Sequence, residues 1–462
     1  MRGKEVFSLS AGLAFLTALR LYLAGTMPLT PDEAYYREWS HHLQGGYLDH
    51  PFMVALWIRI GTWLAGDSPL GARFLGPISV LPGSFFLFCA ARNLFGQDGA
   101  RIGIRAVWLL NATLMVGLGC ATMTPDTPLV FFTTLTVWAL SVALKVKHTL
   151  SKVLAWSAVG GGLGLGFDSK YTAVLVGAAM ACGLLLNADW RRRLSPWCAV
   201  PAFLLSAAPV IWWNKAHHWA SFIKQGGRTG DWHPARAAQF LGELIGGQIG
   251  LATPLVFAIF AMGLVHAYRR RAEVGAYLLC WIALLPLCVF LQHALGDRVQ
   301  ANWPAVVYPA WALIGALSLV RVRWAVASGC AIFVLVAVHA VYQVPALAPN
   351  KDPVARQTAG WERFASDAAS LVQQKKADAV AAEDYGVASK LAEAGLKVPV
   401  IGLDPRWQFL GLAAQPFQNV LIINDIHPNS PKGEVICRSY AGHAIRCYRV
   451  TVSAVKDGVV LP

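Results

Sequence analysis

Acidic side chains stand at or near the ends of long apolar runs in this sequence, where a membrane-embedded chain has least reason to carry charge. The set comprises Asp32, Glu33, Glu38, Asp49, Asp126, Asp168, Glu243 and Asp297. Short basic clusters stand at the opposite ends of the runs. Carboxylates that reach one membrane face from separate loops can accept a proton or hold a cation. The pattern predicts a site that acts on a molecule delivered by the bilayer.

Two of these acidic residues open a predicted helix. Thr30 supplies a hydroxyl cap and Pro31 stands at the first helical position, which together are a strong helix start. Asp32 and Glu33 then fall in the first turn, where the helix dipole favours negative charge. Stabilising this helix end is one explanation for both carboxylates.

The spacing of the aromatic residues favours a chemical role. Asp32, Tyr35, Tyr36 and Trp39 recur at i, i+3, i+4 and i+7, so they share one face of the helix. A carboxylate beside aromatic rings at a membrane surface is suited to hold a sugar ring or a headgroup, and it can take a proton from an attacking hydroxyl. We therefore expect Tyr35 and Tyr36 to contact the substrate.

A second carboxylate and an imidazole follow in the same loop, at Asp49 and His50. Two side chains are too few to identify a metal site, and Asp49 also suits a turn that continues through Pro51. We expect Asp49 and His50 to contact the substrate.

Asp126 lies between two prolines in the next segment of this kind. Pro128 is expected to open a helix with Thr127 as its cap, which leaves Asp126 one residue outside the helix on the same face. Because the cap does not need Asp126, we expect this carboxylate to orient a substrate or a cation.

A glycine-rich run at residues 160–166 leads into Lys170 and Tyr171. The run lies inside an apolar span and follows no strand, which excludes a nucleotide-binding loop and favours close packing of transmembrane helices. A lone ammonium on the acidic face can bind a phosphate. The alternative is a lysine that anchors the helix at the interface.

Two further segments belong to the same face. Arg228 ends a cationic and aromatic stretch that starts at Asn214, and Arg298 precedes Asn302 and Trp303 at the start of an apolar run. The two arginines are candidates for phosphate binding, and the other two side chains are expected to shape the pocket.

The elements that position these residues are transmembrane helices. The chain of 462 residues is 56% hydrophobic and 14% charged, against about 25% charged residues in soluble proteins. Its net charge of +14 comes from 39 basic and 25 acidic residues. The basic residues lie in short clusters between apolar spans, so they indicate membrane orientation and headgroup contact rather than nucleic-acid binding.

Eleven apolar runs approach the roughly 17–25 residues that span a bilayer. They lie near residues 7–27, 70–90, 103–120, 128–144, 153–168, 171–187, 197–213, 250–268, 273–291, 303–320 and 324–342. With the amino terminus in the cytoplasm, five short basic connections all fall on the cytoplasmic side, as the positive-inside rule requires. The long external loop at 28–69 predicts two interfacial helices, around 32–43 and 53–65, and a third is expected around 235–245.

The part after residue 345 has the composition of a soluble domain. We expect a transmembrane domain over 1–345 and a small α/β domain over 346–462, with a helix at 361–374 and five short strands. Cys437 and Cys447 stand in facing strand candidates on the extracytoplasmic side. They are expected either to form a disulfide or to remain as two buried thiols.

The order of these motifs resembles the bacterial branch of the protein mannosyltransferase superfamily, which includes the aminoarabinose transferases that modify lipid A. The resemblance rests on the segments at 30–36, 49–51, 124–128, 162–171 and 299–304. It covers residues 1–345 strongly and the tail weakly. Phe52 follows Pro51 where many relatives have a second proline, and the tail is short for an aminoarabinose transferase.

The resemblance implies the GT-C fold and a sugar donor linked through one phosphate to a polyprenol such as undecaprenyl phosphate. It implies inverting transfer on the periplasmic side of the bacterial inner membrane, with Asp32 at the catalytic position and Glu33 beside it. Lys170, Arg298 and Arg228 would neutralise the phosphate. Some relatives use a divalent metal ion, although this sequence shows no full ligand set.

Other functions remain as alternatives to transfer onto lipid A, lipopolysaccharide core or another envelope glycolipid. The acceptor could be a secreted protein that receives the sugar on a hydroxyl. A transporter of lipid-linked sugars would carry charges near the middle of its spans and show inverted repeats. The sequence has neither feature, which favours an enzyme.

Overall fold

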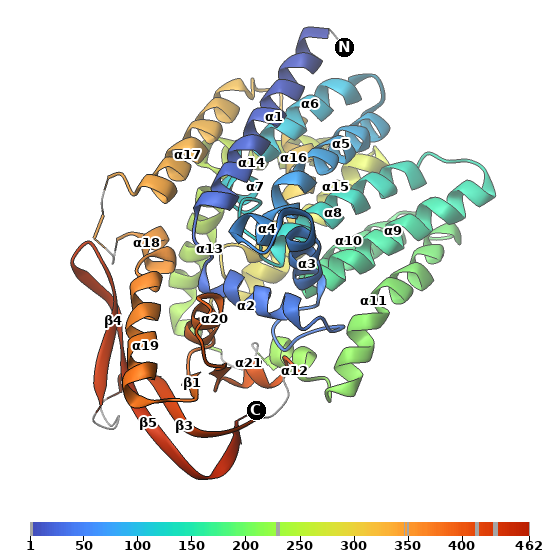
Figure 1. Cartoon of the computed structure of the whole chain (residues 1–462). Helices are drawn as coiled ribbons and strands as arrows, with labels where there is room; N and C mark the ends of the chain where they lie inside the picture. The colour runs from blue at the N-terminus through green and yellow to red at the C-terminus, as the bar shows by residue number, and fades with distance from the viewer. Residues whose placement is uncertain are drawn as a thin grey trace.

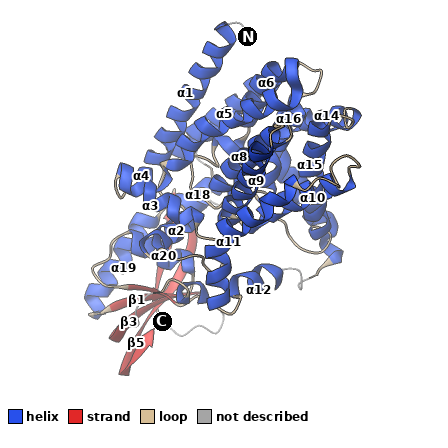
Figure 2. Cartoon of the chain, turned by 90° about the vertical axis from the view of Figure 1, so that its right-hand side faces the viewer, coloured by secondary structure: helices blue, strands red, loops and turns tan. Residues whose placement is uncertain are grey.

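The computed structural model describes residues 3–227, 232–345, 347–348, 351–411, 415–427 and 433–461. Long helices run side by side through the amino-terminal three quarters of the chain, and a sheet with its own helices lies at one end of them (Figure 1). Figure 2 shows that the strands are confined to that end, beneath α2 and α3.

All eleven predicted apolar runs are helical. Their main helices are α1 (Gly3–Thr26), α5 (Leu75–Phe95), α6 (Gly99–Asn111), α8 (Asp126–Ala143), α9 (Thr149–Ser169), α10 (Val174–Leu186), α11 (Ala199–Ala216), α14 (Pro254–Arg269), α15 (Val274–His293), α16 (Tyr308–Ala316) and α17 (Arg323–Tyr342). Shorter helices at the joints are α4 (Pro69–Arg73), η1 (Gly96–Asp98), α7 (Leu114–Gly117), η2 (Tyr171–Ala173), η3 (Ser195–Cys198), η4 (Pro234–Arg236) and η5 (Trp303–Val307).

The expected count of eleven spans is not reproduced by helix length. Within the described residues, seven helical stretches are long and apolar enough to cross a membrane, and α5 and α6 fall in one of them, Pro69–Asn111. An eighth is counted if α13 (Ala237–Ala252) and α14, which are bent by 105° from each other, form one broken span. The apolar stretches Tyr171–Leu186 and Trp303–Ala316 are shorter than the others.

The external loop at 28–69 forms two helices, as predicted. They are α2 (Pro31–His41) and α3 (Met53–Ala65). The start of α2 is a reciprocal cap, in which the Thr30 hydroxyl accepts from the Glu33 N–H at 3.3 Å and the Glu33 carboxylate accepts from the Thr30 N–H at 3.0 Å. The later external loop forms α12 (Ala220–Gly227) and then α13, which begins two residues after the expected start.

The carboxy-terminal part is an α/β unit. It contains α18 (Pro353–Thr358), α19 (Trp361–Lys375), α20 (Tyr385–Glu393) and α21 (Pro405–Gln408), with strands β1 (Ala379–Ala382), β2 (Val400–Gly402), β3 (Gln415–Asp425), β4 (Glu434–Tyr440) and β5 (His443–Leu461). The strand order is β2-β1-β3-β5-β4. β1 pairs in parallel with β2 and β3, whereas β5 pairs antiparallel with β3 and β4.

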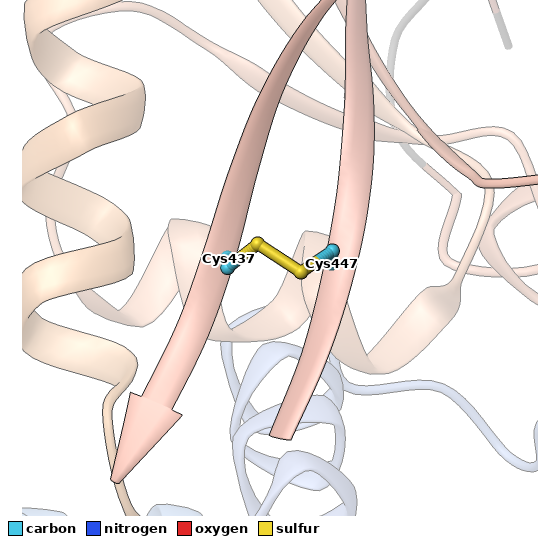
Figure 3. Close-up of a disulfide and its surroundings, with 2 residues drawn as sticks. All are labelled: Cys437 and Cys447. Atoms are coloured by element: carbon cyan, nitrogen blue, oxygen red, sulfur yellow. A yellow bond between two sulfur atoms is a disulfide. The ribbon is translucent and has the colours of Figure 1, made fainter. Parts of the chain in front are cut away.

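A disulfide joins the outer hairpin of this sheet. Cys437 and Cys447 are directly opposite each other on β4 and β5, and their sulfur atoms are 2.01 Å apart (Figure 3). The bond closes the loop from β4 to β5, and Tyr440 in that loop lines a pocket with residues at the ends of α1 and α17.

The carboxy-terminal unit packs firmly on the first external loop. α20 lies against α2 in both views (Figures 1 and 2). One buried cluster includes Trp39 and Ile58 from the loop helices together with Phe364 and Trp407 from the tail. The domain boundary expected at residue 345 stays a prediction, because the two parts share this core.

Candidate active site

Glu33 is the centre of a buried polar cluster rather than an open catalytic group. Its carboxylate is 1% exposed and receives two hydrogen bonds from Arg73, each 2.6 Å long. The Met123 N–H donates to the same carboxylate at 2.9 Å, and Thr30 donates through both its N–H and its hydroxyl. Burial opposes ionisation, but the ion pair with Arg73 holds the pKa of Glu33 below its ordinary value.

This geometry favours a structural role for Glu33, and its expected catalytic role stays a prediction. Five donors surround its two oxygens, so the carboxylate has no room for a substrate hydroxyl. Glu33 instead ties the start of α2 to α4 through Arg73 and to the segment before α8 through Met123. Arg73 is itself anchored by the carbonyl oxygens of residues 24, 27 and 28.

Asp32, one residue earlier, points into a different environment. It is exposed to solvent, and one of its oxygens accepts a hydrogen bond of 2.7 Å from the Tyr385 hydroxyl. Crowding by the surrounding protein and the nearby charges of Glu33 and Asp49 raise the pKa of Asp32, while the Tyr385 hydroxyl and Arg406 act in the opposite direction. An accessible carboxylate of raised pKa is suited to take a proton from an attacking hydroxyl.

Asp49 joins three parts of the chain. Lys224 of α12 lies 2.7 Å from one carboxylate oxygen, and Arg406 of α21 donates to the other at 2.9 Å. Tyr35 donates to the latter oxygen at 3.4 Å. Burial alone would raise the pKa of Asp49, but Lys224 and Arg406 hold it below its ordinary value. Asp49 therefore stays ionised and holds two cations beside the site.

Three predicted site residues from distant segments meet at a second carboxylate. The Lys170 ammonium donates to both oxygens of Asp126 at 2.8 and 2.9 Å, and the Asn302 amide donates to one of them at 2.6 Å. Asp126 is 5% exposed and Lys170 6% exposed. An ammonium has three N–H donors, and within the described residues only these two contacts use them. Lys170 therefore keeps a donor for an incoming anion.

The position of Asp126 differs from the expectation. α8 begins at Asp126 rather than at Pro128, and Thr127 does not cap it. The Thr127 hydroxyl instead donates to the carbonyl oxygens of Gly119 and Thr122. Asp126 thus lies inside the first helical turn, where the helix end also favours its negative charge.

The short helix α12 contacts both the Asp49 cluster and the cluster of Asp126, Lys170 and Asn302. Ser221 hydrogen-bonds the hydroxyl of Tyr171, the neighbour of Lys170, at 2.8 Å. One turn later, Lys224 reaches Asp49, and Gln225 donates to the Asp49 carbonyl oxygen at 2.6 Å. The clusters are therefore neighbours on one face of the molecule, reached through a single helix.

The remaining predicted site residues that the structure describes have ring or ion-pair contacts with other side chains. Arg298 is largely exposed and pairs with Glu243 at 2.7 Å, so in this structure it is not part of either cluster. The Trp303 ring lies 5.6 Å from that of His293, and the His50 ring lies 6.2 Å from that of Tyr36. Tyr36 is buried against Trp39. Arg228 lies outside the described residues.

Several site residues were missed by sequence reasoning. Tyr385 and Arg406 come from the tail, in segments without apolar periodicity, and nothing in their local sequence indicates contact with a loop over 330 residues earlier. Arg73 and Lys224 gave weak signals. Arg73 is a single cation inside an apolar run, and Lys224 belongs to the cationic stretch that leads to Arg228.

The side chains that the structure describes do not fit a metal site. Nowhere in the part of the chain that the structure describes do three His, Cys, Asp or Glu side chains gather as ligands. The carboxylates of the site are each engaged by cationic or hydroxyl donors instead. No step of the reaction is therefore assigned to a metal ion.

Comparison with known proteins finds relatives and solved structures to which this chain is similar. A family model described as dolichyl-phosphate-mannose-protein mannosyltransferase matches residues 49–213. The chain is 24% identical over 370 residues to lipid A galacturonosyltransferase RgtD of Rhizobium johnstonii, a match that covers 78% of this chain and 76% of RgtD. It is 25% identical over 324 residues to an undecaprenyl phosphate-alpha-4-amino-4-deoxy-L-arabinose arabinosyl transferase of Pseudomonas fluorescens, covering 59% of this chain and 56% of that protein.

A solved structure has the same fold over nearly the whole chain. ArnT from Cupriavidus metallidurans, crystallised with undecaprenyl phosphate, matches with a TM-score of 0.70 at 15% identity, and the match covers 97% of this chain and 98% of ArnT. The chain therefore has the fold of the multi-pass GT-C glycosyltransferases, and its residues 49–213 are similar to the mannosyltransferase family model. Within that class, the chain is related to the aminoarabinose transferases, which confirms the resemblance inferred from the motifs.

Proposed function

We propose that the protein transfers a sugar from a polyprenyl-phosphate carrier to a hydroxyl of lipid A or a related envelope glycolipid. The observation that carries the proposal is the accessible Asp32 carboxylate, held by Tyr385 on the face that also presents Lys170 and Asp126. Relatives named for transfer to lipid A and for an undecaprenyl-phosphate donor support the two substrates.

The reaction needs a base for the acceptor and cations for the leaving group. Asp32 accepts the proton of the acceptor hydroxyl as its oxygen attacks the anomeric carbon of the donor sugar. The bond between that carbon and the phosphate oxygen breaks, and the electron pair leaves with polyprenyl phosphate. Attack from the side opposite the phosphate inverts the anomeric configuration.

The leaving phosphate gains negative charge as the bond breaks, so cations near it lower the barrier. Lys170 is fixed by Asp126 and keeps one donor available, which suits it to bind a phosphate oxygen. Lys224, which is partly exposed beside Asp49, is a second cation on this face. Arg298 reaches the phosphate only if its pair with Glu243 opens.

The proposed orientation puts the amino terminus in the cytoplasm and both clusters with the carboxy-terminal unit in the periplasm. Basic connections between the apolar runs support this orientation. A disulfide in the carboxy-terminal unit also suits an oxidising compartment. The membrane would be the inner membrane, where lipid A and polyprenyl-phosphate sugars are both present at the outer leaflet.

A reconstituted assay tests the proposed function. Purified protein in nanodiscs is supplied with lipid A and with undecaprenyl phosphate carrying either galacturonic acid or aminoarabinose, and lipid A is then analysed by mass spectrometry. A gain of one sugar mass from one donor supports the proposal and identifies the sugar. Hydrolysis without a change in lipid A contradicts a lipid A acceptor and favours a protein acceptor, as the matching family model describes.

Lys170→Ala is expected to weaken binding of undecaprenyl phosphate by roughly 10- to 100-fold, since a charge-assisted hydrogen bond contributes about 1.5–3 kcal/mol. Microscale thermophoresis on the purified protein measures this, and Lys170→Arg is expected to recover part of the affinity. Lys375→Ala, which removes an ammonium paired with Glu434 in the carboxy-terminal unit, is the matched control, with less than about a threefold change expected. Unchanged affinity in Lys170→Ala contradicts the phosphate role.

A further inference from the structure

The carboxy-terminal unit reaches the proposed catalytic carboxylate directly. Tyr385 is the first residue of α20, and its hydroxyl donates to Asp32 at 2.7 Å. Arg406, in α21, donates to Asp49 at 2.9 Å. Two segments of the tail therefore contact two carboxylates of the first external loop, the exposed Asp32 and the buried Asp49.

The contact from Tyr385 is built on a close backbone approach. A Cβ atom on Gly386 would lie 2.9 Å from the Cβ of Pro31, so α20 meets the start of α2 at a distance that only glycine allows. The Lys390 ammonium donates to the Leu29 carbonyl oxygen at 3.0 Å. Asp384 caps α20 by accepting from two backbone N–H groups. The helix that carries Tyr385 is thus fixed on both sides of the contact.

The Tyr385 ring is held from two directions. The Arg406 guanidinium lies over it, 4.5 Å from the ring centre, and the Tyr35 ring approaches edge-on with a centre-to-centre distance of 5.0 Å. Arg406 is in turn fixed by Asp49 and by Asp404, which it meets at 2.8 Å. Since burial and the adjacent Asp32 raise the pKa of Tyr385, the phenol keeps its proton and acts as the donor.

We propose that Tyr385 is a positioning residue of the active site, which fixes one oxygen of Asp32 and leaves the other for the acceptor hydroxyl, while Arg406 holds Tyr385 in place. Within the described residues, the second Asp32 oxygen has no protein partner. The inference rests on the proposed role of Asp32 as the base. It makes the carboxy-terminal unit part of the catalytic site rather than an accessory domain.

The hydrogen bond from Tyr385 should affect how sugar transfer depends on pH. The charged and titratable groups that face Asp32 are Glu33 and Tyr36 on its own helix, Asp49 in the loop, and Tyr385 and Arg406 from the tail. Of these, Tyr385 is the group that donates a hydrogen bond to the carboxylate. A hydrogen bond to the ionised form lowers the pKa of an acid, so removing the hydroxyl must raise the pKa of Asp32.

The test is the pH profile of transfer by full-length Tyr385→Phe in nanodiscs, with the donor that the wild-type protein uses. Asp32 must be ionised to act as the base, so activity falls as pH drops through its pKa. In Tyr385→Phe this acidic limb is expected to move to higher pH by roughly 0.5 to 1 pH unit. At a pH on the limb, transfer activity is then about 3- to 10-fold lower than in the wild-type protein, and the decrease is smaller at higher pH.

Matched variants distinguish the positioning of Asp32 by Tyr385 from a general structural effect of the substitution. Tyr448→Phe removes a hydroxyl from the same unit at a buried position packed on Phe364, and its limb is expected to stay in place. Arg406→Gln should move the limb in the same direction as Tyr385→Phe, and Arg406→Lys should move it less. Sugar transfer by the wild-type protein in the same assay shows whether the proposed function is correct. An unmoved limb in a folded Tyr385→Phe, or an equal loss at every pH, would overturn the proposal.

Discussion

Asp32→Asn is expected to reduce sugar transfer by roughly a thousandfold, within the range that loss of a general base produces. The amide has nearly the shape of the carboxylate, and its oxygen can still accept from the Tyr385 hydroxyl. The fold and the donor site should therefore survive, while the proton acceptor is lost. Turnover is measured as sugar added to lipid A, and affinity for undecaprenyl phosphate is expected to change by less than about twofold.

Glu38→Gln is the matched control for that variant. Glu38 lies on the same helix, near Arg37 and Asp67 rather than beside Tyr385, and burial raises its pKa to about 7. Its loss is expected to leave most of the transfer activity. If Asp32→Asn keeps more than about a tenth of wild-type turnover, Asp32 is not the base.

Arg73→Met is expected to destabilise the protein by roughly 3–5 kcal/mol, because it strips the partner from a buried charge. Glu33 would remain 1% exposed without its cation, and three carbonyl oxygens would lose their donor. Protonation of Glu33 on lowering the pH should recover part of the loss. The wild-type protein should respond in the opposite sense, since a carboxylate with a depressed pKa loses its stabilising contribution as pH falls through the folded-state pKa.

Thermal unfolding in detergent, followed by tryptophan fluorescence at several pH values, measures both effects. Arg37→Met breaks the more exposed pair of Arg37 with Asp67 and serves as the control, with a cost within about 1 kcal/mol. A melting temperature for Arg73→Met equal to that of the control would contradict the structural role of Glu33. Glu33 would then again be a candidate catalytic residue.

Much of the site was predictable from the positions of charges relative to apolar runs. Asp126, Lys170 and Asn302 are far apart in sequence, yet alternation of the spans places their ends on one membrane face. The structure brings these three into direct contact. Sequence could not show that Asp126 occupies two of the donors of Lys170, because that depends on how α8 and α9 pack.

The difference between Asp32 and Glu33 was not predictable for a similar reason. First-turn position and acidity are the same for Asp32 and Glu33, and only the direction of each side chain separates them. Glu33 turns inward to Arg73, forty residues later, and Asp32 turns outward to Tyr385 in the tail. Neither partner is local, so no sequence pattern within α2 distinguishes the two residues.

The number of spans stays a prediction, because within the described residues helix length gives seven or eight where the apolar runs give eleven. An apolar run counts every residue of low polarity, including caps and turns that lie outside the regular helix. The run predicted at 303–320 contains a 3-10 turn and only nine residues of α16. Apolar runs and helix length therefore give different numbers of spans for the described residues.

Mass spectrometry of envelope glycolipids from cells tests whether Asp32 catalyses sugar transfer to such a glycolipid. Cells with the wild-type protein, with the gene deleted and with Asp32→Asn are compared. One lipid A species heavier by a sugar is expected in the first and not in the other two. Identical glycolipids in all three, or the modified species in cells with Asp32→Asn, would contradict the catalytic role of Asp32.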